Sequence, residues 1–326
     1  MIQKKLRFFA LVFTSFIFLS CTSIQKTAMN SLASNLSGAD KRGKALNKKS
    51  NENLMLPLTG ETDSILMADF FPTALKLYEI LHAQNPEHQG LSLMTASLSV
   101  MYANAFIQHK AEMLPQEAYL LQNAEFQRAK MHYLRARNLV FSVFEQRYPG
   151  FSKALLGFDI DVIENYVARL KQSDVEAAYW LGAAWLGAWS LDPLDTSLLP
   201  TVHSAVRLLE KAALLEPDYN EGAIWTILLS FYASAPADFG GDTERAYYAY
   251  EKALEASSGK SPGVYIAYAE SICVAAQDAE GFIDALQKAL AIDANENPAT
   301  RLQTIIAQEK ANYLMDTIDY YFLFWD

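Results

Sequence analysis

The sequence is poor in cysteine, glycine and proline, and each shortage narrows the range of folds. Its 326 residues include two cysteines, 14 glycines and 11 prolines. A disulfide-stapled scaffold needs many more cysteines in a much shorter chain. A protein of many short strands needs more glycine and proline for its turns. Because 51% of the residues are hydrophobic and 12% are aromatic, the chain can bury a large core, and the composition favours helices.

The sequence also lacks the signatures of catalysis and of bound cofactors. The five histidines show no His-x-x-x-His pair and no neighbouring cysteine cluster, as a zinc site requires. There is no Gly-x-Ser-x-Gly elbow, no phosphate-binding loop and no dinucleotide fingerprint. Carboxylates are abundant, but in helical proteins most of them lie on solvated faces. We therefore expect no enzyme activity, no metal and no cofactor.

Basic residues are scarce over most of the chain. The whole sequence has 27 basic and 37 acidic side chains, but residues 1–20 hold three basic residues and residues 21–60 hold six basic and two acidic residues. The remainder has 18 basic against 35 acidic residues, a net charge near −17. A body this acidic repels phosphate backbones, so we expect no binding to nucleic acid.

The N-terminal apolar run is too short to span a membrane. Lys4, Lys5 and Arg7 precede twelve apolar residues, Phe8 to Leu19, which as a helix reach about 18 Å against about 30 Å of hydrocarbon. Residues 1–20 are therefore predicted to be a secretory signal peptide. The run ends in Phe18-Leu19-Ser20-Cys21, which resembles a bacterial lipoprotein lipobox. We expect lipidation of Cys21; the alternative is an ordinary signal peptide followed by a stray thiol.

Residues 21–60 have the composition of a spacer. Ser, Asn and Lys are frequent, and no apolar period is sustained. We predict a flexible tether behind the lipid anchor, whose basic residues either attract anionic lipid headgroups or only keep the spacer solvated. Thr22 stands where Asp would resemble an inner-membrane retention signal, so anchoring to the outer membrane, facing the periplasm, is favoured. The second cysteine, Cys273, then has no disulfide partner and is expected to be an inert core thiol.

From residue 61 onward, apolar residues recur at the helical spacing of three and four. A motif recurs within this pattern: a small residue, an aromatic residue or leucine four positions later, and a small residue three positions after that. Its clear copies are Ala129-Tyr133-Ala136, Ala205-Leu209-Ala212 and Ala246-Tyr250-Ala253, and its weaker copies are Ala74-Tyr78-Leu81 and Phe282-Leu286-Ala289. The motif is typical of the second helix of a tetratricopeptide repeat, where small residues let two helices approach closely.

First helices are expected upstream of these motifs, as in Leu181-Gly182 followed by Trp185. The spacing departs from the usual 34 residues, with an insertion of about eleven residues around residues 191–201. We predict an all-α, tetratricopeptide-like helical-repeat solenoid over residues 61–326, with irregular insertions and a C-terminal capping helix from Pro298. Asp242 is expected to cap one helix, and the apolar end, residues 320–325, to dock on the body or on another subunit. The alternative is an irregular helical bundle without true repeats.

Aromatic residues concentrate in one helix and indicate both a core and a groove. Trp185 and Trp189 lie on the same helical stripe as Leu181, which predicts core packing. Other aromatic and polar side chains are candidates for a concave groove that holds an apolar ligand or a partner segment. These candidates are Tyr179, Trp180 and Trp225, with Asn104, Asn220 and Glu270 as the polar groups.

Several fragments in order along the chain carry a family resemblance. They are Pro72-Thr73-Ala74-Leu75-Lys76-Leu77-Tyr78-Glu79, Tyr102-Ala103-Asn104-Ala105-Phe106, Arg135-Ala136-Arg137, Tyr148-Pro149-Gly150-Phe151, Ala178-Tyr179-Trp180, Pro217-Asp218-Tyr219-Asn220-Glu221-Gly222-Ala223 and Gly240-Gly241-Asp242. Together with the lipobox, they resemble the tetratricopeptide-repeat lipoproteins of tripartite ATP-independent periplasmic (TRAP) transporters, the T-component family. Trp225 departs from the pattern, since His is expected close to the preceding Gly-Ala pair.

The resemblance implies a lipid-anchored periplasmic accessory protein that binds the transporter's solute-binding protein and self-associates as a homo-oligomer. It also implies a hydrophobic ligand that rests in or passes through a helical cavity, with transport energy supplied by the membrane subunits. Two alternatives from other classes remain. One is a repeat lipoprotein that scaffolds outer-membrane assembly or secretion machinery, and the other is a carrier that sequesters an apolar molecule without a protein partner.

Overall fold

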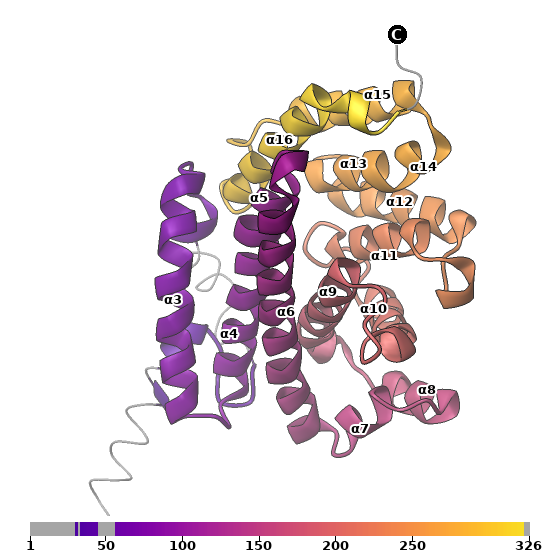
Figure 1. Cartoon of the computed structure of the whole chain (residues 1–326). Helices are drawn as coiled ribbons and strands as arrows, with labels where there is room; N and C mark the ends of the chain where they lie inside the picture. The colour runs from indigo at the N-terminus through magenta and orange to yellow at the C-terminus, as the bar shows by residue number, and fades with distance from the viewer. Residues whose placement is uncertain (1–29, 32, 45–55, 323–326) are drawn as a thin grey trace, which may run out of the picture.

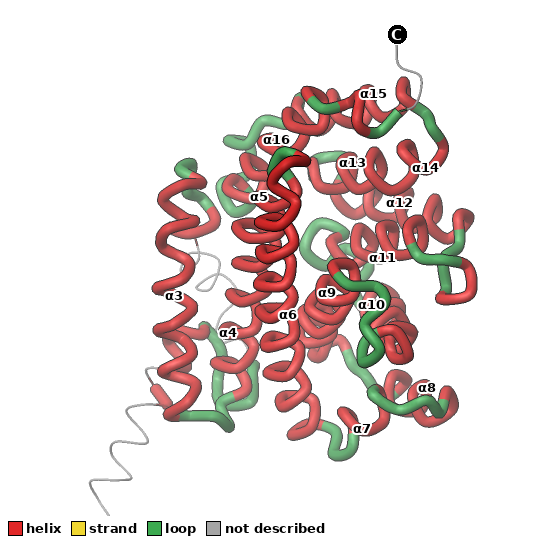
Figure 2. The backbone as a smooth tube through the Cα atoms, viewed as in Figure 1, coloured by secondary structure: helices red, strands yellow, loops and turns green. Residues whose placement is uncertain are grey.

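The computed structural model describes residues 30–31, 33–44 and 56–322, and this part of the chain is helical without a β-strand (Figures 1 and 2). Its α-helices are α3 (Ser64–Gln84), α4 (Gln89–Met101), α5 (His109–Glu112), α6 (Tyr119–Arg147), α7 (Phe151–Leu155), α8 (Ile160–Ala168), α9 (Val175–Leu191), α10 (Val202–Leu215), α11 (Ala223–Ser234), α12 (Thr243–Ser257), α13 (Pro262–Tyr268), α14 (Val274–Ala276), α15 (Ala279–Leu290) and α16 (Arg301–Asp316). Two π-helical segments, η1 (Tyr102–Gln108) and η6 (Ala269–Cys273), interrupt longer helices, and the 3₁₀ turns are η2 (Gln116–Ala118), η3 (Gln172–Asp174), η4 (Leu199–Thr201), η5 (Ala237–Phe239) and η7 (Ile318–Tyr320). The all-α prediction is confirmed.

Side-chain caps fix where several helices begin. The Asp242 carboxylate accepts from the Arg245 backbone N–H at 3.0 Å, as expected from the sequence. Asp63 caps α3 and Asp278 caps α15 in the same way, each at 2.9 Å. These bonds satisfy donors that the first helical turn leaves free. At α4 the cap is the His88 ring, which accepts from Leu91.

Neighbouring helices pack in succession around a curved path. Packed pairs include α3 with α4, α4 with α6, α6 with α9, α9 with α10, α11 with α12, α13 with α15, and α15 with α16. In Figure 1 this path begins at α3 on the left and ends with α16 at the top, beside α5. Helices α3 and α16 also pack against each other, although most of the chain separates them.

The recurrent small-and-large motif lies at these helix contacts. Most of its residues are buried to 2% exposure or less, namely Ala129, Tyr133, Ala136, Ala205, Leu209, Ala212, Ala246, Ala253, Phe282, Leu286 and Ala289. Gly182 of α9 shows why a small residue is needed, because a Cβ atom there would lie 2.4 Å from Cγ of Leu209 on α10. The packing that the motif predicts is thus present between α9 and α10.

Gly182→Ala should lower the free energy of unfolding by about 2 kcal/mol, because the added methyl group overlaps the Leu209 side chain. Gly263→Ala on α13 is the matched control, since its Cβ would meet no atom closer than 4.0 Å, and it should be neutral or slightly stabilising. Urea unfolding followed by circular dichroism measures both. Equal losses in the two variants would contradict close packing at Gly182.

A second, smaller core lies at the C-terminal end. It is formed by buried side chains of α13, η6, α15 and α16 and by Phe322. The Phe322 ring packs edge-on against Phe282 at 5.1 Å, so docking of the terminal segment on the body is confirmed as far as residue 322. Cys273 is fully buried in this core, and burial raises the pKa of its thiol to about 11. A thiol in this state is inert, as expected.

Part of the predicted flexible spacer is folded onto the body. Residues 30–31 and 33–37 are helical and lie near the end of α3 and the start of α4. Ser34 Oγ is 3.0 Å from Nε2 of His88, and the Tyr78 hydroxyl donates to the Leu36 carbonyl at 2.8 Å. The prediction of a wholly flexible tether was wrong for this stretch, because its few apolar residues and backbone carbonyls find partners on α3 and α4. The signal peptide, Cys21 and the rest of the spacer lie outside the described residues.

The continuous helical run Gln89–Glu112 is long and apolar enough to cross a membrane by length and composition alone. However, 78% of its apolar window is buried within the protein. It contains α4, η1 and α5, and α6 packs along it. This burial is that of a core helix.

Candidate functional site

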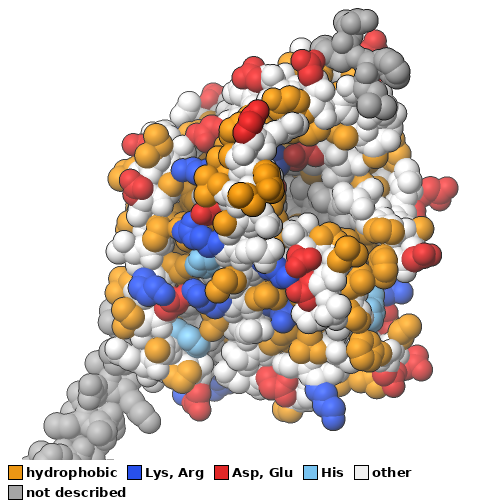
Figure 3. Space-filling model, viewed as in Figure 1, with side chains coloured by type: hydrophobic (Ala, Val, Ile, Leu, Met, Phe, Trp, Pro, Cys, Tyr) orange, Lys and Arg blue, Asp and Glu red, His pale blue; other side chains and the backbone are white. Residues whose placement is uncertain are grey.

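The molecule is hollowed on the face shown in Figure 3, between the column of α5 and α6 and the stack of α11 and α13. Side chains of both charges meet at its upper rim, where α16 lies beside α5 (Figures 1 and 3). Five of the six groove candidates, all except Trp225, are partly exposed or exposed, and they belong to η1, α9, η6 and the loop before α11. Their contacts show which of them lie together.

Asn104 and Glu270 stand at the two ends of one chain of hydrogen bonds. Asn104 bonds to the Tyr133 side chain, and the Tyr133 hydroxyl donates to Oε1 of Gln108 at 2.7 Å. The Gln108 amide then donates to Oε1 of Glu112 at 2.9 Å. From Glu112 the hydrogen-bond series continues through Lys310 to Glu270.

Lys310 of α16 joins the two carboxylates. Its ammonium lies 2.8 Å from Oε2 of Glu112 on α5 and 2.9 Å from Oε1 of Glu270 on η6. The side chains are 17%, 30% and 33% exposed for Lys310, Glu112 and Glu270, so water reaches part of each of them. Lys310 thus links α16, near the end of the described residues, to α5 and η6.

Electrostatics favour the charged form of this lysine. Burial alone would lower its pKa, but Glu270 and Glu112 outweigh burial and raise it above the ordinary value. Burial also raises the pKa of Glu270, and Lys310 offsets this effect only in part. At Glu112 the balance is reversed, because Lys310 and the Gln108 bond overcome burial and lower its pKa. Two carboxylates against one ammonium leave a net negative charge here.

Both end residues of this hydrogen-bond series, Asn104 and Glu270, lie in π-helical segments. In η1 the His109 N–H bonds to the carbonyl of Asn104, and in η6 the Val274 N–H bonds to that of Ala269, five residues back in each case. A π-turn inserts a residue into the helix and rotates the side chains that follow, and it occurs frequently at functional sites. Here it aims Asn104, Gln108 and Glu270 toward their partners.

Tyr179, Trp180 and Asn220 come together as a second group. The Tyr179 and Trp180 rings meet edge to face with centroids 4.8 Å apart, and Tyr219 lies 5.2 Å from Tyr179. Asn220 bonds to the Tyr179 side chain. Burial raises the pKa of Tyr179 to about 12, which keeps its hydroxyl protonated. The group offers partly exposed aromatic faces beside one amide, at the junction of α9 with the loop before α11.

Trp225 is placed differently from the other candidates. It is 8% exposed, and its indole N–H donates to the Pro217 carbonyl at 2.9 Å. Its ring meets Tyr248 of α12 edge to face at 5.8 Å. These contacts fix Trp225 between α11 and α12, where it supports the loop that carries Asn220.

Sequence reasoning missed Lys310, Glu112 and Gln108, and it treated Tyr133 only as a packing residue. A further missed residue is His109, which is 7% exposed and whose Nε2 atom has no hydrogen-bond partner within the part of the chain that the structure describes. Burial, reinforced by the Lys310 charge, lowers its pKa to about 4, so the ring is neutral at pH 7. One signal in the sequence was Lys310, which stands four residues after Ile306 and four before Leu314 in the apolar period of the last helix. Its partners Glu112 and Glu270 are too far away in sequence for this pattern to identify them.

A separate cavity of about 510 Å³ lies at the opposite end of the protein, lined by Lys41, Arg42, Glu87, Gln89 and Gln146. It lies where the folded part of the spacer meets α4 and α6. Within residues 30–31, 33–44 and 56–322, no group of three or more His, Cys, Asp or Glu side chains is arranged to hold a metal.

Comparison with known proteins identifies relatives over nearly the whole body. A family model described as TRAP transporter T-component matches residues 60–322. An uncharacterized protein of Treponema pallidum (strain Nichols) is 38% identical over 313 residues, which cover 94% of this chain and 97% of that protein. The matched range includes every groove candidate and the Lys310 bridge.

Proposed function

Since the chain belongs to the TRAP transporter T-component family, we propose that it is a lipid-anchored periplasmic accessory protein of such a transporter. In this role it binds the solute-binding protein and takes up an apolar or amphipathic ligand in the hollow between α5, α6, α11 and α13. The fold is interpreted as a tetratricopeptide-like solenoid closed by α16. The lipobox at Cys21 supports anchoring, and Thr22 supports the outer membrane as its location.

The observation that carries the ligand proposal is a group of partly exposed aromatic rings together with exposed amides, which we assign to the lining of the hollow. Aromatic faces of Tyr179, Trp180 and Tyr219 lie within ring-contact distance of one another, and the amides of Asn104 and Asn220 are exposed. A ligand site is commonly an apolar concave surface with a few convergent polar groups. Tyrosine and tryptophan supply large contact areas with little loss of side-chain entropy.

The binding proposal is tested with residues 21–326 and with the TRAP-type solute-binding proteins of the same organism. Calorimetry should detect complex formation, and native mass spectrometry should detect a small molecule retained by the chain. Trp180→Ala should reduce ligand retention at least tenfold while the unfolding midpoint changes little. Leu194→Ala is the matched control, because Leu194 is 80% exposed on a loop away from these residues.

Failure to bind any solute-binding protein would overturn the transporter role. Co-purification with outer-membrane barrel or secretion components instead would favour the scaffold alternative. A retained ligand without a protein partner would favour a carrier. An unchanged ligand signal in Trp180→Ala would remove this aromatic group from the proposed site.

A further inference from the structure

One part of the spacer, residues 37–44, is fixed against the start of α4, and we call it the docked segment. Its Lys41 carbonyl accepts from the backbone N–H of Gln89 at 3.0 Å, and its Arg42 carbonyl accepts from the Arg147 guanidinium at 3.5 Å. The two donors belong to α4 and α6. Lys41 and Arg42 therefore have defined positions on the body, unlike basic residues on a solvated tether.

Gly90 shows how closely the docked segment approaches α4. It is the second residue of that helix, and a Cβ atom there would lie 2.8 Å from Cβ of Ala39 and 3.1 Å from Oγ of Ser37. The three nearest atoms all belong to the docked segment. A side chain at position 90 would therefore push first against this segment.

A polar cavity of about 510 Å³ lies beside the docked segment. Among the described residues it is lined by Lys41, Arg42, Glu87, Gln89 and Gln146, none of which is apolar. Its volume is in the range of small-molecule sites, ~300–1,000 Å³. An apolar ligand would leave these polar groups without partners, so the cavity suits a charged or strongly polar group.

The Gln89 side chain is a fixed donor in this cavity. It is only 9% exposed, and its Oε1 accepts from Nε of Arg147 at 2.8 Å. Because arginine can only donate, this bond fixes which way the amide points. The amide NH₂ group then donates to Oε1 of Gln146 at 3.2 Å, and such a group carries a second N–H for another acceptor.

The charges around the cavity favour an anion. Lys41 and Arg42 stand against Glu87, and Lys41 reaches Glu87 only loosely, at 3.6 Å with both side chains exposed. The carboxylate of Asp40 turns to its own segment, where it accepts from the backbone N–H groups of Arg42 and Lys44 at 2.8 and 2.9 Å. The start of α4 adds a partial positive charge. The cavity is thus positive on an otherwise acidic body.

The lipid anchor of the proposed function brings this cavity to phospholipid headgroups. Cys21 is nine residues before Asn30, so an extended chain between them reaches at most about 30 Å. The helical stretch at residues 30–31 and 33–37 leads from Asn30 into the docked segment. An anionic headgroup presents a phosphate, which arginine and lysine bind through strong charge-assisted hydrogen bonds.

We propose that the cavity is a binding site for a phosphate group, presented by the headgroup of an anionic phospholipid. Lys41 and Arg42 bind the phosphate oxygens from the docked segment, and Gln89 donates from the start of α4. This inference rests on the proposed function only through the anchor at Cys21. A bound headgroup holds this end of the molecule on the membrane, so the opposite end, where α16 lies beside α5, faces away from it (Figure 1).

Vesicle co-sedimentation tests the site with residues 21–326 made without the lipid. The chain should bind phosphatidylcholine vesicles that contain phosphatidylglycerol and should not bind vesicles of phosphatidylcholine alone. Lys41→Gln with Arg42→Gln should reduce this binding about tenfold or more, because each basic residue near an anionic surface strengthens binding severalfold. Lys44→Gln with Lys153→Gln is the matched control, since it removes the same charge at exposed positions that do not line the cavity. It should keep most of the binding.

Gly90→Ala separates a built cavity from a merely basic spacer. It keeps every charge, but its methyl group overlaps Ala39, so it should displace the docked segment and weaken vesicle binding as much as the double charge variant does. Gly263→Ala, whose Cβ meets no atom closer than 4.0 Å, should bind as the unmodified chain does. The thermal midpoint of each variant should stay within a few degrees, which shows that the body is folded.

Hydrogen exchange at residues 41–44 and 89 distinguishes the two sources of a phosphate. Soluble dihexanoyl phosphatidylglycerol should slow exchange there, and inorganic phosphate at the same concentration should slow it less, because the cavity has room for the whole headgroup. Equal slowing by inorganic phosphate, without binding to vesicles, would assign the site to free phosphate and overturn the lipid headgroup as its occupant.

Three further outcomes would overturn the proposal. Binding that does not depend on phosphatidylglycerol would exclude recognition of an anionic headgroup. An equal loss in the Lys44 and Lys153 control would indicate general charge attraction, and unchanged binding in Gly90→Ala would assign the effect to a solvated basic spacer. None of these assays contains a solute-binding protein or an attached lipid, so their failure would leave the transporter role to its own calorimetric test.

Discussion

Lys310→Met should lower the free energy of unfolding by about 2–3 kcal/mol, measured by urea unfolding at pH 8. The substitution leaves Glu112 and Glu270 facing each other without the ammonium that lies 2.8 and 2.9 Å from them. Removing one partner of a fully buried ion pair costs about 3–5 kcal/mol. The residual exposure of these side chains reduces that figure, because water screens part of the repulsion.

The triple variant Lys310→Met, Glu112→Gln, Glu270→Gln is the matched control. It removes the same ammonium but leaves no unpaired charge, so it should be more stable than Lys310→Met alone. A loss equal to that of the single variant would show that packing of the lysine stem, not charge, accounts for the effect. Hydrogen exchange of α16 is the second readout, and it should accelerate in the single variant.

The loss in Lys310→Met should shrink as the pH falls from 8 toward 5.5. The pKa of Glu270 already lies above its ordinary 4.5 because of burial, and without Lys310 it rises further. A carboxylate with a raised pKa in the folded state takes up protons that the unfolded chain does not, so stability falls as pH rises. His109, with its pKa lowered to about 4, costs both proteins stability below about pH 6.5, so it largely cancels in the difference. A loss independent of pH would contradict this account.

The helical body and its internal contacts were predictable because they depend on local spacing. Ala205 and Leu209 on one helix and Gly182 on another are separated by short stretches, and the small-and-large motif identifies their contact. The folded helical stretch at residues 30–31 and 33–37 was not predicted, since polar composition outweighed its few apolar residues. Its stability comes from partners such as His88 and Tyr78 that no local pattern reveals.

The candidate site was predictable only in part, for a physical reason. Tyr179 and Asn220 were both chosen from the sequence, and they are hydrogen-bonded. Asn104 and Glu270 were chosen singly, but the lysine that links them is on the last helix. The two π-helical segments shift side chains off the α-helical period, so a 3.6-residue pattern misplaces Gln108 and Glu270. The hydrogen-bond series from Asn104 to Glu270 depends on the packing of α16 near α5 and η6, which brings Lys310 to Glu112 and Glu270. The types of these residues alone do not reveal this contact.

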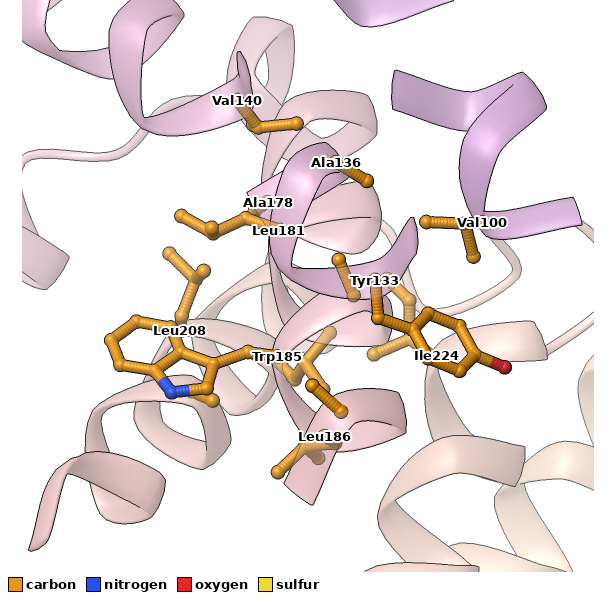
Figure 4. Close-up of a cluster of buried hydrophobic side chains, with 14 of the residues drawn as sticks. Val100, Tyr133, Ala136, Val140, Ala178, Leu181, Trp185, Leu186, Leu208 and Ile224 are labelled. Carbon is orange, nitrogen blue, oxygen red and sulfur yellow. The ribbon is translucent and has the colours of Figure 1, made fainter. Parts of the chain in front are cut away.

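Trp185→Ala should be the most damaging single substitution in the aromatic helix, with a loss of about 3–5 kcal/mol in unfolding free energy. Trp185 is fully buried, and Figure 4 shows its indole beside Leu208 of α10, away from Tyr133. Phe141 meets the ring edge to face at 5.2 Å, and the Arg137 guanidinium lies over it at 5.5 Å. A cavity of this size in the main core cannot be filled by neighbouring side chains.

Trp185→Phe and Trp180→Ala separate packing from ligand binding. The Trp185 indole N–H is buried and has no hydrogen-bond partner among the described residues, so Trp185→Phe removes a polar group that burial penalises and should cost less than half of the alanine loss. Trp180 is only half-buried, so Trp180→Ala should cost about 1 kcal/mol. If Trp180→Ala destabilised the protein as much as Trp185→Ala, both rings would serve the core, and the hollow would lose its main aromatic surface. If instead Trp180→Ala lowered ligand retention at nearly unchanged stability, the same helix would supply the core on one face and the binding surface on the other.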